Sequence, residues 1–279
     1  MRLVTLRTAE GTRAGRVEGD EIVELDWPDV AAVLAANPDL APVADLDGAR
    51  RPLDGADLAP LVPRPSKIIC LGLNYASHIK EMGRELPKYP TMFAKFPRAL
   101  IGAYDDITLP LVSDETDWEV ELAFVIGRPV RHASAAEAEA AIAGYTVMND
   151  VSVRDWQNRT IQFLQGKFFE GTTPLGPALV TADELPGGSA DDLVLRTEVD
   201  GQVMQDGKTS DLLFKPVDIV RYVSQIATLD PGDVIATGTP SGVGAGRSPK
   251  VFLQPGQTVR TTIEGVGELL NTCVKETRG

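Results

Sequence analysis

The stretch Asp117-Trp-Glu-Val-Glu-Leu-Ala-Phe-Val-Ile-Gly127 alternates in a way that predicts a β-strand with two carboxylates on one face. In a strand of period two, the apolar even-numbered positions from 120 to 126 point one way, and Glu119 and Glu121 point the other way. At roughly 3.3 Å of rise per residue, the two Cα atoms lie about 7 Å apart, so both side chains can converge on one point. Like charges about 5 Å apart repel by roughly 3 kcal/mol at an effective dielectric of 20, a cost that a cation would reverse. The alternative interpretation is an exposed edge strand with a polar outer face.

The composition is that of an ordinary globular protein and narrows the range of partners. The 279 residues are enough for a sizeable core in one or two domains. No apolar run approaches the roughly 18 residues of a membrane span, and the first residues lack a secretory signal. We therefore expect no membrane partner and a cytoplasmic location. The net charge of −13 argues against a nucleic-acid partner, because such affinity comes chiefly from Lys and Arg. Cys70 and Cys273 are expected to be buried free thiols.

Turn and periodicity signals divide the chain into a small N-terminal unit, residues 1–62, and a larger domain, residues 63–279. A proline-rich linker over 58–66 marks the boundary. Helices are predicted over 28–36, 75–82, 135–143, 151–160 and 216–227, the third opening on a capping box of Ser134 and Glu137 and stopping at Gly144. Strands are predicted over 2–7, 12–17, 21–25, 67–71, 91–96, 99–101, 107–109, 118–126, 145–148, 178–180, 193–199, 202–204, 234–237, 258–263 and 268–274. The Asp200-Gly201 pair predicts a type I′ hairpin turn. The fold class is α+β and rich in strands.

A third carboxylate, Asp150, follows the predicted strand 145–148. None of Glu119, Glu121 and Asp150 has an obvious Lys or Arg partner nearby in the sequence. Oxygen ligands select hard cations, and no zinc-type spacing of Cys and His is present. The three residues therefore predict a site for Mg²⁺ or Mn²⁺ that leaves positions open for water and a chelating substrate.

The chain has only two histidines, and His78 is the better candidate for catalysis. Glu81 lies three residues further along a predicted helix, where a carboxylate can orient the imidazole to deprotonate a water. The alternative is an incidental pair on a surface helix. His132, at a predicted strand-to-helix turn, is expected to be inert. Lys167, which follows Gly166, could present an ammonium in a partly apolar pocket.

Two further segments suggest substrate contacts. Asp150, Arg154 and Gln157 fall at helical spacing and would share one face of the helix predicted over 151–160. The glycine-rich run 238–244 fits neither the dinucleotide-binding nor the P-loop pattern. It could form a backbone nest for a carboxylate beside the Thr239 hydroxyl, or it could be a purely structural loop.

Together these motifs resemble the fumarylacetoacetate hydrolase family over residues 66–274. The matching pieces are Leu71-Gly-Leu-Asn-Tyr75, His78-Ile-Lys-Glu81, Glu119-Val-Glu121, Asn149-Asp150, Arg154-Asp155-Trp-Gln157, Gly166-Lys167, Thr173-Pro-Leu-Gly-Pro177 and the run 231–244. The resemblance implies a mixed β-roll or sandwich domain behind a small N-terminal α+β domain, assembled as a homodimer. It also implies one Mg²⁺ or Mn²⁺ on Glu119, Glu121 and Asp150. The implied catalytic residues are His78, Glu81 and Lys167, and the implied substrate contacts are Tyr75, Arg154, Gln157 and Thr239.

The activity implied is cleavage of a C–C bond in 2,4-dioxo acids, which are acylpyruvates such as fumarylpyruvate, to pyruvate and a carboxylic acid. The 2-oxo acid would chelate the metal, and water activated by His78 would attack a carbonyl two carbons further along. Lys167 would stabilise the oxyanion, and pyruvate enolate would leave. One alternative is a decarboxylase of oxaloacetate, or an isomerase or decarboxylase of aromatic ring-cleavage dioates. Another is a catalytically inactive member that only binds.

Overall fold

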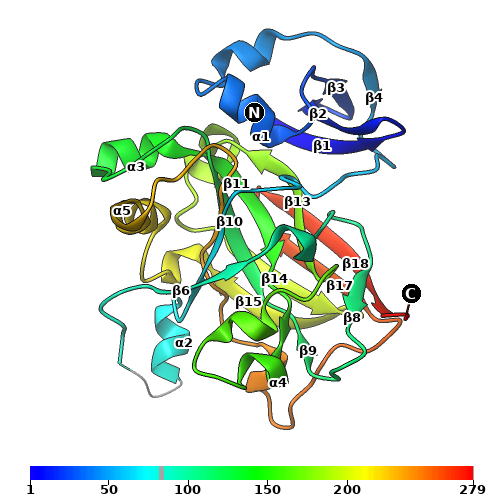
Figure 1. The fold of residues 1–279 in the computed structure, drawn as a ribbon, viewed down its shortest axis with the longest axis vertical. Helices are drawn as coiled ribbons and strands as arrows, with labels where there is room; N and C mark the ends of the chain where they lie inside the picture. The colour runs from blue at the N-terminus through cyan, green and yellow to red at the C-terminus, as the bar shows by residue number, and fades with distance from the viewer. Residues whose placement is uncertain (82–84, 279) are drawn as a thin grey trace.

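The computed structural model describes residues 1–81 and 85–278, and the side chains of residues 78, 80 and 81 are outside the described part. A large mixed sheet forms the centre of the molecule (Figure 1). Its central strand is β10 (Val120–Ile126), which pairs antiparallel with β11 (Ile142–Asn149) and with β16 (Val234–Ala236). The stretch 117–127 therefore contains an interior strand of this sheet, paired on both sides.

The strand order of this sheet is β4-β3-β2-β1-β13-β11-β10-β16-β5-β6, with the short β7 beside β13. Its other strands are β1 (Arg2–Thr8), β2 (Gly11–Glu18), β3 (Glu21–Glu24), β4 (Arg50–Pro52), β5 (Ile68–Gly72), β6 (Thr91–Lys95), β7 (Leu100–Ile101) and β13 (Thr173–Val180). Pairing of Arg2 with Val180 carries the sheet across the linker predicted over 58–66. The domain boundary near residue 62 stays a prediction.

A second sheet has the order β15-β14-β17-β18-β8. These strands are β8 (Ile107–Leu109), β14 (Val194–Val199), β15 (Gln202–Lys208), β17 (Thr258–Ile263) and β18 (Gly267–Lys275). The predicted type I′ hairpin joins β14 to β15, with φ of 50° at Asp200 and 77° at Gly201. Val120 and Leu122 of the first sheet share a buried cluster with Leu195 and Leu269 of the second. The two sheets therefore pack face to face, as a sandwich requires.

The helices are α1 (Val30–Ala36), α2 (Ala76–Glu81), α3 (Ala135–Ala141), α4 (Arg154–Gln157) and α5 (Pro216–Ile226). Helices α3 and α5 lie side by side and cover one side of the large sheet (Figure 1). Their buried cluster includes Ile219 and Val223, which pack with Phe124 and Ile126 of β10. The capping box of Ser134 and Glu137 is present as predicted.

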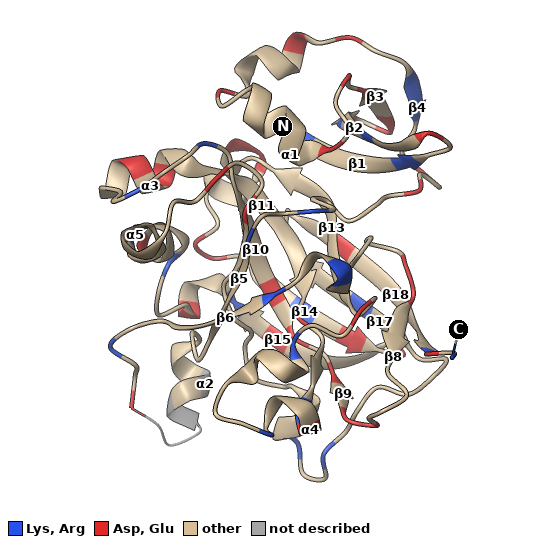
Figure 2. Ribbon diagram, viewed as in Figure 1, with Lys and Arg blue, Asp and Glu red and all other residues tan. Residues whose placement is uncertain are grey.

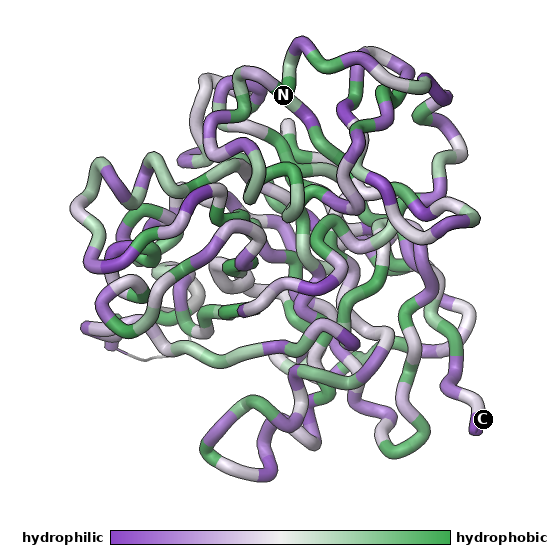
Figure 3. The backbone as a smooth tube through the Cα atoms, turned by 45° about the horizontal axis from the view of Figure 1, so that its top comes forward, coloured by the Kyte–Doolittle hydropathy of each residue, from purple (hydrophilic) through white to green (hydrophobic). Residues whose placement is uncertain are grey.

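The hydropathy of the chain follows this arrangement. Apolar segments run along the central strands, and hydrophilic segments dominate the outer loops (Figure 3). Every residue of β10 is buried, so both of its faces are covered. The alternative prediction of an exposed edge strand is therefore wrong. No helix within the described ranges is long and apolar enough to cross a membrane.

Two predicted helices differ from the structure. The helix predicted over 151–160 is helical only over Arg154–Gln157, because Ser152 and Val153 instead form β12 and pair with β9 (Thr116–Asp117). The helix predicted to stop at Gly144 ends at Ala141, and Gly144 lies inside β11. A Cβ at Gly144 would lie 2.6 Å from the carbonyl oxygen of Val180, so close strand packing explains this glycine.

Candidate active site and metal centre

Three buried carboxylates converge where β10 begins and β11 ends. Glu119, Glu121 and Asp150 each offer an oxygen, and these oxygens lie within 4.8 Å of one another. Pairing of the two strands fixes the geometry, because the Asp150 N–H donates to the Glu119 carbonyl over 2.9 Å. The Glu119 N–H donates in turn to Oδ1 of Asn149 over 3.0 Å. The structure therefore brings together the three metal ligands predicted from the sequence.

Buried cations surround two of these carboxylates, although none of the three has a Lys or Arg partner nearby in the sequence. Nζ of Lys167 lies 2.7 Å from both Oε2 of Glu119 and Oδ2 of Asp150. Nη1 of Arg154 lies 2.7 Å from Oε1 of Glu119, and Nζ of Lys95 lies 2.6 Å from Oδ1 of Asp150. Acidic and basic segments accordingly meet in the middle of the molecule (Figure 2). Each cation comes from a segment distant in the sequence, which is why no local pattern reveals the pairing.

Glu121 differs from its two neighbours. Its Oε2 accepts a hydrogen bond of 2.8 Å from the Gly238 N–H, and among the described residues its Oε1 has no partner. Burial, followed by the charges of Asp150 and Glu119, raises the pKa of Glu121 well above its ordinary value. Burial also acts to raise the pKa of Asp150, but Lys167 and Lys95 outweigh it and lower that pKa to about 2. Within the described part of the chain, Glu121 is thus the one carboxylate of the centre without a cation partner.

The donor set fits a hard divalent cation. Each oxygen of an ionised carboxylate has two lone pairs, so bonds to Lys167 and Lys95 leave acceptor capacity on Glu119 and Asp150. The unpaired Oε1 of Glu121 is a buried acceptor that a cation would satisfy. An all-oxygen set of this kind suits Mg²⁺ and Mn²⁺ alike. Glu119, Glu121 and Asp150 could therefore hold either ion.

A small cavity of about 150 Å³ opens beside the carboxylates. Four of the predicted catalytic and substrate-contacting residues line it, namely Arg154, Gln157, Lys167 and Thr239. Apolar walls come from Leu71, Leu73, Phe93 and Phe163, and Nζ of Lys167 lies 4.7 Å from the ring centre of Phe93. The ammonium of Lys167 is therefore held between charged and aromatic groups, close to the partly apolar setting predicted for it.

The remaining predicted site residues are Tyr75, which does not line the cavity, and His78 and Glu81, whose side chains are outside the described part of the structure. Tyr75 is buried with no hydrogen-bond partner for its hydroxyl in the described chain, and it does not line the cavity. His78 and Glu81 belong to α2, but their side chains are outside the described residues, so their roles stay predictions. His132 lies on the surface beside Gln225, away from the carboxylates.

Arg154 and Gln157 interact on α4 as their spacing suggests, whereas Asp150 precedes this helix. Nη1 of Arg154 donates to Oε1 of Gln157 over 2.9 Å, and Nε donates to Oδ2 of Asp117 over 2.7 Å. Within the described residues, Nη2 of Arg154 is buried and has no partner. Burial lowers the pKa of Arg154, but Glu119 and Asp117 raise it by more, so the guanidinium stays charged. Arg154, a residue of the cavity wall, thus has one NH₂ group without an acceptor in the described part of the chain.

The glycine-rich run passes over the same cavity. Gly238 adopts a φ of 95° and directs its N–H to Glu121, so this amide serves the protein's own carboxylate. The Thr239 hydroxyl donates to the Val120 carbonyl over 2.8 Å and accepts from Nε2 of Gln205 over 2.8 Å. Thr239 therefore lines the cavity while its hydroxyl proton is donated to the Val120 carbonyl.

Sequence reasoning missed three residues of this centre: Lys95, Asp117 and Gln205. Lys95 ends the short strand β6 and is buried with Asp150. A lysine inside an otherwise apolar run is the only local signal for it, because buried lysines are rare without a partner. The partners of Asp117 and Gln205 lie far along the chain, and neither residue has a local signal.

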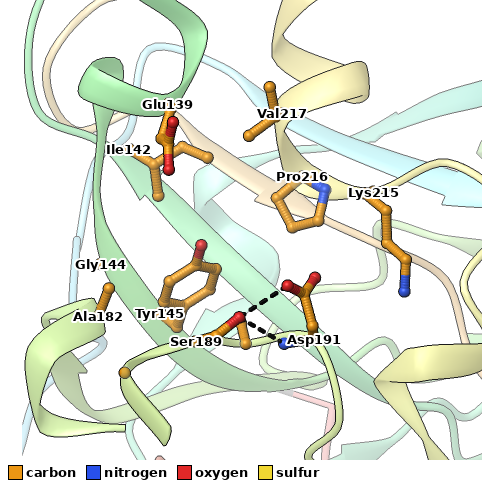
Figure 4. Close-up of a pocket in the computed structure, with 12 residues that line it drawn as sticks. Glu139, Ile142, Gly144, Tyr145, Ala182, Ser189, Asp191, Lys215, Pro216 and Val217 are labelled. Atoms are coloured by element: carbon orange, nitrogen blue, oxygen red, sulfur yellow. Dashed lines mark hydrogen bonds between the residues drawn. The ribbon is translucent and has the colours of Figure 1, made fainter. Parts of the chain in front are cut away.

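A second hollow lies between α3, β11 and the start of α5 (Figure 4). Ser189 donates to Asp191 over 2.8 Å, and Nζ of Lys215 donates to the Thr209 carbonyl over 2.9 Å. Ser189, Asp191 and Lys215 are thus paired within the protein, unlike Oε1 of Glu121 and Nη2 of Arg154 beside the carboxylates.

The fold and the buried acidic centre define a strand-rich enzyme of mixed α+β architecture. A family model described as "Fumarylacetoacetate (FAA) hydrolase C-terminal" matches residues 67–274. The chain belongs to the fumarylacetoacetate hydrolase family. The resemblance stated from the sequence motifs is confirmed.

Relatives in this family carry different activity names. A human protein named oxaloacetate tautomerase FAHD2A, mitochondrial, is 48% identical over 219 residues, which cover 78% of this chain and 69% of the relative. The 5-carboxymethyl-2-hydroxymuconate delta-isomerase of Mycobacterium smegmatis matches with a TM-score of 0.83 and 38% identity over 99% of this chain and 100% of that one. A fumarylacetoacetate hydrolase from Exiguobacterium antarcticum gives a TM-score of 0.88 and 33% identity with the same coverage. The family is thus one of enzymes that include tautomerases, isomerases and hydrolases.

Proposed function

We propose that this protein is a divalent-metal-dependent enzyme that interconverts the keto and enol forms of a small 2-oxo dicarboxylic acid. Oxaloacetate is the first substrate to test. The observation that carries the proposal is that Arg154 lines the same cavity as Glu119 and Glu121 and has a buried Nη2 without a partner among the described residues. A 2-oxo acid would approach the carboxylate centre, and a second carboxylate on it would satisfy the guanidinium. The name of the human relative, at 48% identity, supports this choice.

The size of the cavity favours a compact substrate. Its volume of about 150 Å³ is below the ~300–1,000 Å³ of drug-sized ligand sites. The cavity wall combines the apolar residues Leu71 and Phe93 with charged residues that include Glu119, Arg154 and Lys167. A four-carbon acid with charges at both ends matches this distribution.

The chain's own residues provide electrostatic support for an enolate. A bound Mg²⁺ or Mn²⁺ supplies a Lewis acid that polarises the 2-oxo group. Burial lowers the pKa of Lys167, but Asp150 and Glu119 raise it by more, to above the ordinary lysine value. Lys167 therefore keeps its proton and acts as a fixed positive charge beside the developing oxyanion, not as a base. We assign the proton transfer at the substrate's C3 to His78, with Glu81 orienting its imidazole.

Acylpyruvate hydrolysis, the activity predicted from the sequence, is the second candidate. It uses the same enolate as its leaving group, and the Exiguobacterium antarcticum neighbour named as a fumarylacetoacetate hydrolase shares 33% identity with this chain. In this reaction His78 would activate a water instead of taking a proton from carbon. Decarboxylation of oxaloacetate requires no water and is the third candidate reaction of the same centre.

The predicted homodimer also stays a proposal, and exposed apolar side chains support it. Ile161 is 99% exposed, and Phe96 and Phe168, which are 48% and 39% exposed, pack edge to face. Light scattering of the Ile161→Asp variant tests the assembly, because a charge at a covered apolar position should yield monomers. A cytoplasmic location is likewise part of the proposal.

An absorbance assay separates the candidate activities. Purified protein with Mg²⁺ or Mn²⁺ should accelerate the decay of enol oxaloacetate, and a parallel panel of acylpyruvates should report any release of pyruvate. His78→Ala should abolish hydrolysis and slow tautomerisation, whereas decarboxylation should survive better. A metal-loaded protein that changes neither oxaloacetate nor any acylpyruvate would refute the proposal.

A further inference from the structure

Asp117, the first residue of the stretch that decides the fold, is a fully buried carboxylate outside the predicted metal site. Its Oδ1 accepts from the Trp118 N–H over 2.9 Å and from the Gly244 N–H over 2.7 Å. Its Oδ2 accepts from the Ala245 N–H over 2.9 Å and from Nε of Arg154 over 2.7 Å. All four acceptor positions of the carboxylate are therefore in use.

These bonds join two parts of the cavity wall that are far apart in sequence. Arg154 starts α4 and lines the cavity, and its buried Nη2 has no partner among the described residues. Gly244 and Ala245 belong to the run 238–247, here termed the glycine loop. The glycine loop also places Thr239 in the cavity wall and the Gly238 N–H on Glu121. Asp117 is thus the shared anchor of the guanidinium and the loop.

Close packing leaves this anchor little freedom. A Cβ on Gly244 would lie 2.9 Å from Oδ1 of Asp117 and 1.8 Å from the Val251 carbonyl oxygen, so the loop approaches as only glycine permits. Nη1 of Arg154 is also held, by Glu119 and Gln157. With Nε and Nη1 both bonded, the planar guanidinium has one orientation and one free nitrogen.

We propose that Asp117 is a positioning residue that locks the Arg154 guanidinium and the glycine loop into one rigid unit, so that Nη2 of Arg154 selects dicarboxylates over monocarboxylates. The recognition half of this inference rests on the proposed function, because it takes Arg154 as the partner of a substrate carboxylate. The rigid-unit half rests on the hydrogen bonds of Asp117 alone.

Asparagine at this position would break the unit with little change in volume. An amide has one acceptor oxygen, and its NH₂ group would face two donors, either the N–H groups of Trp118 and Gly244 or the Ala245 N–H and Nε of Arg154. Asp117→Asn must therefore release the guanidinium or the loop. Asp155→Asn is the matched control, since Asp155 is next to Arg154 in sequence but bonds Ser113 and is not bonded to the glycine loop.

The test measures binding of two probes by calorimetry in excess Mg²⁺. Malate and lactate are unreactive 2-hydroxy acids that differ in the second carboxylate. The wild type should bind malate more tightly than lactate. In D117N this preference should fall by about 10- to 100-fold, because a hydrogen bond to a charged group contributes free energy of that size. The affinity for lactate should not change. D155N should keep the preference. Amide hydrogen exchange at Gly244 and Ala245 should be faster in D117N and unchanged in D155N.

Each outcome has a defined meaning. A D117N protein that keeps the wild-type preference for malate, or that weakens both probes equally, would overturn the inference. A wild type without any preference would refute the substrate proposal instead, and exchange at the two loop amides would then decide the rigid unit alone. Should D117N not fold, Arg154→Lys removes the Nε donor and keeps the charge. An unchanged preference in R154K would also overturn the inference.

Discussion

Replacing Glu121 by Gln should make the metal-free protein more stable, although Glu121 is a predicted metal ligand. Its Oε1 has no partner among the described residues, and oxygens of Glu119 and Asp150 lie within 4.8 Å. The glutamine oxygen can still accept the Gly238 N–H, and its NH₂ group can donate to a neighbouring carboxylate. The substitution thus removes a repelled charge and keeps the existing bond.

The size of the effect follows from Coulomb's law. At 4.8 Å and an effective dielectric of 20, each like-charge contact costs about 3.5 kcal/mol, and Glu121 has two such neighbours. Its attraction to Lys167 and its uptake of a proton offset part of this cost. We expect E121Q to raise the free energy of unfolding by about 1–3 kcal/mol at pH 8, which is about 2–4 °C in melting temperature per kcal/mol.

The pH dependence has a definite sign. The pKa of Glu121 in the folded protein is raised above the unfolded value of about 4.3, so the folded state binds the proton more tightly. Wild-type stability therefore falls as the pH rises from the unfolded to the folded pKa. The advantage of E121Q should grow over this window and vanish below pH ~4.

Glu119→Gln is the matched control, two residues away on the same face. Both of its carboxylate oxygens pair with buried cations, Lys167 and Arg154, so E119Q should destabilise the metal-free protein by about 3–5 kcal/mol. Urea unfolding with and without Mg²⁺ measures the free energy of unfolding of both variants. A saturating ion, at 100 times its Kd, should add ~2.7 kcal/mol to the wild type and nothing to either variant. Equal signs for the two variants, or retained stabilisation of E121Q by Mg²⁺, would refute the reasoning.

Two further predictions follow from the buried centre and the core. Lys95→Met should lower the free energy of unfolding by about 3–5 kcal/mol in urea, because Asp150 loses a buried cation, whereas Lys88→Met at an exposed position should change little. A small loss for K95M would show that the Lys95–Asp150 pair is not desolvated. Burial raises the pKa of Cys273 to about 12 and that of Cys70 well above its ordinary value, so a disulfide reagent at pH 8 should label neither thiol until the protein unfolds. Rapid labelling of the native protein would contradict this.

Local patterns in the sequence were sufficient for several parts of the fold. The strand that carries Glu119 and Glu121, the Asp200-Gly201 hairpin and the capping box of Ser134 all depend on residues within a few positions of one another. The three carboxylates could be predicted as a group because β10 and β11 are long, regular and paired. Carboxylates at the adjacent ends of two such strands lie close together.

What the sequence could not predict depends on contacts between distant segments. Ser152 and Val153 read as part of a helix, but pairing with β9 overrides their local preference. The burial of Lys95 and Lys167 against Asp150 joins residues 55 and 17 positions apart, through separate strands and loops. The charge balance of the centre, and with it the distinct state of Glu121, therefore had to come from the structure.

The central claim is that this carboxylate centre, loaded with a divalent ion, promotes enolisation of a 2-oxo acid. Deuterium exchange at C3 of 2-oxoglutarate, followed by NMR in Mg²⁺-containing heavy water, measures that step directly, since this dicarboxylic acid has neither an acyl group to hydrolyse nor a 3-carboxylate to lose. We expect exchange well above the rate in buffer with Mg²⁺ alone for the wild type, and exchange at the buffer rate for E119Q. Exchange at the buffer rate for the wild type, or undiminished exchange in E119Q, would contradict the claim.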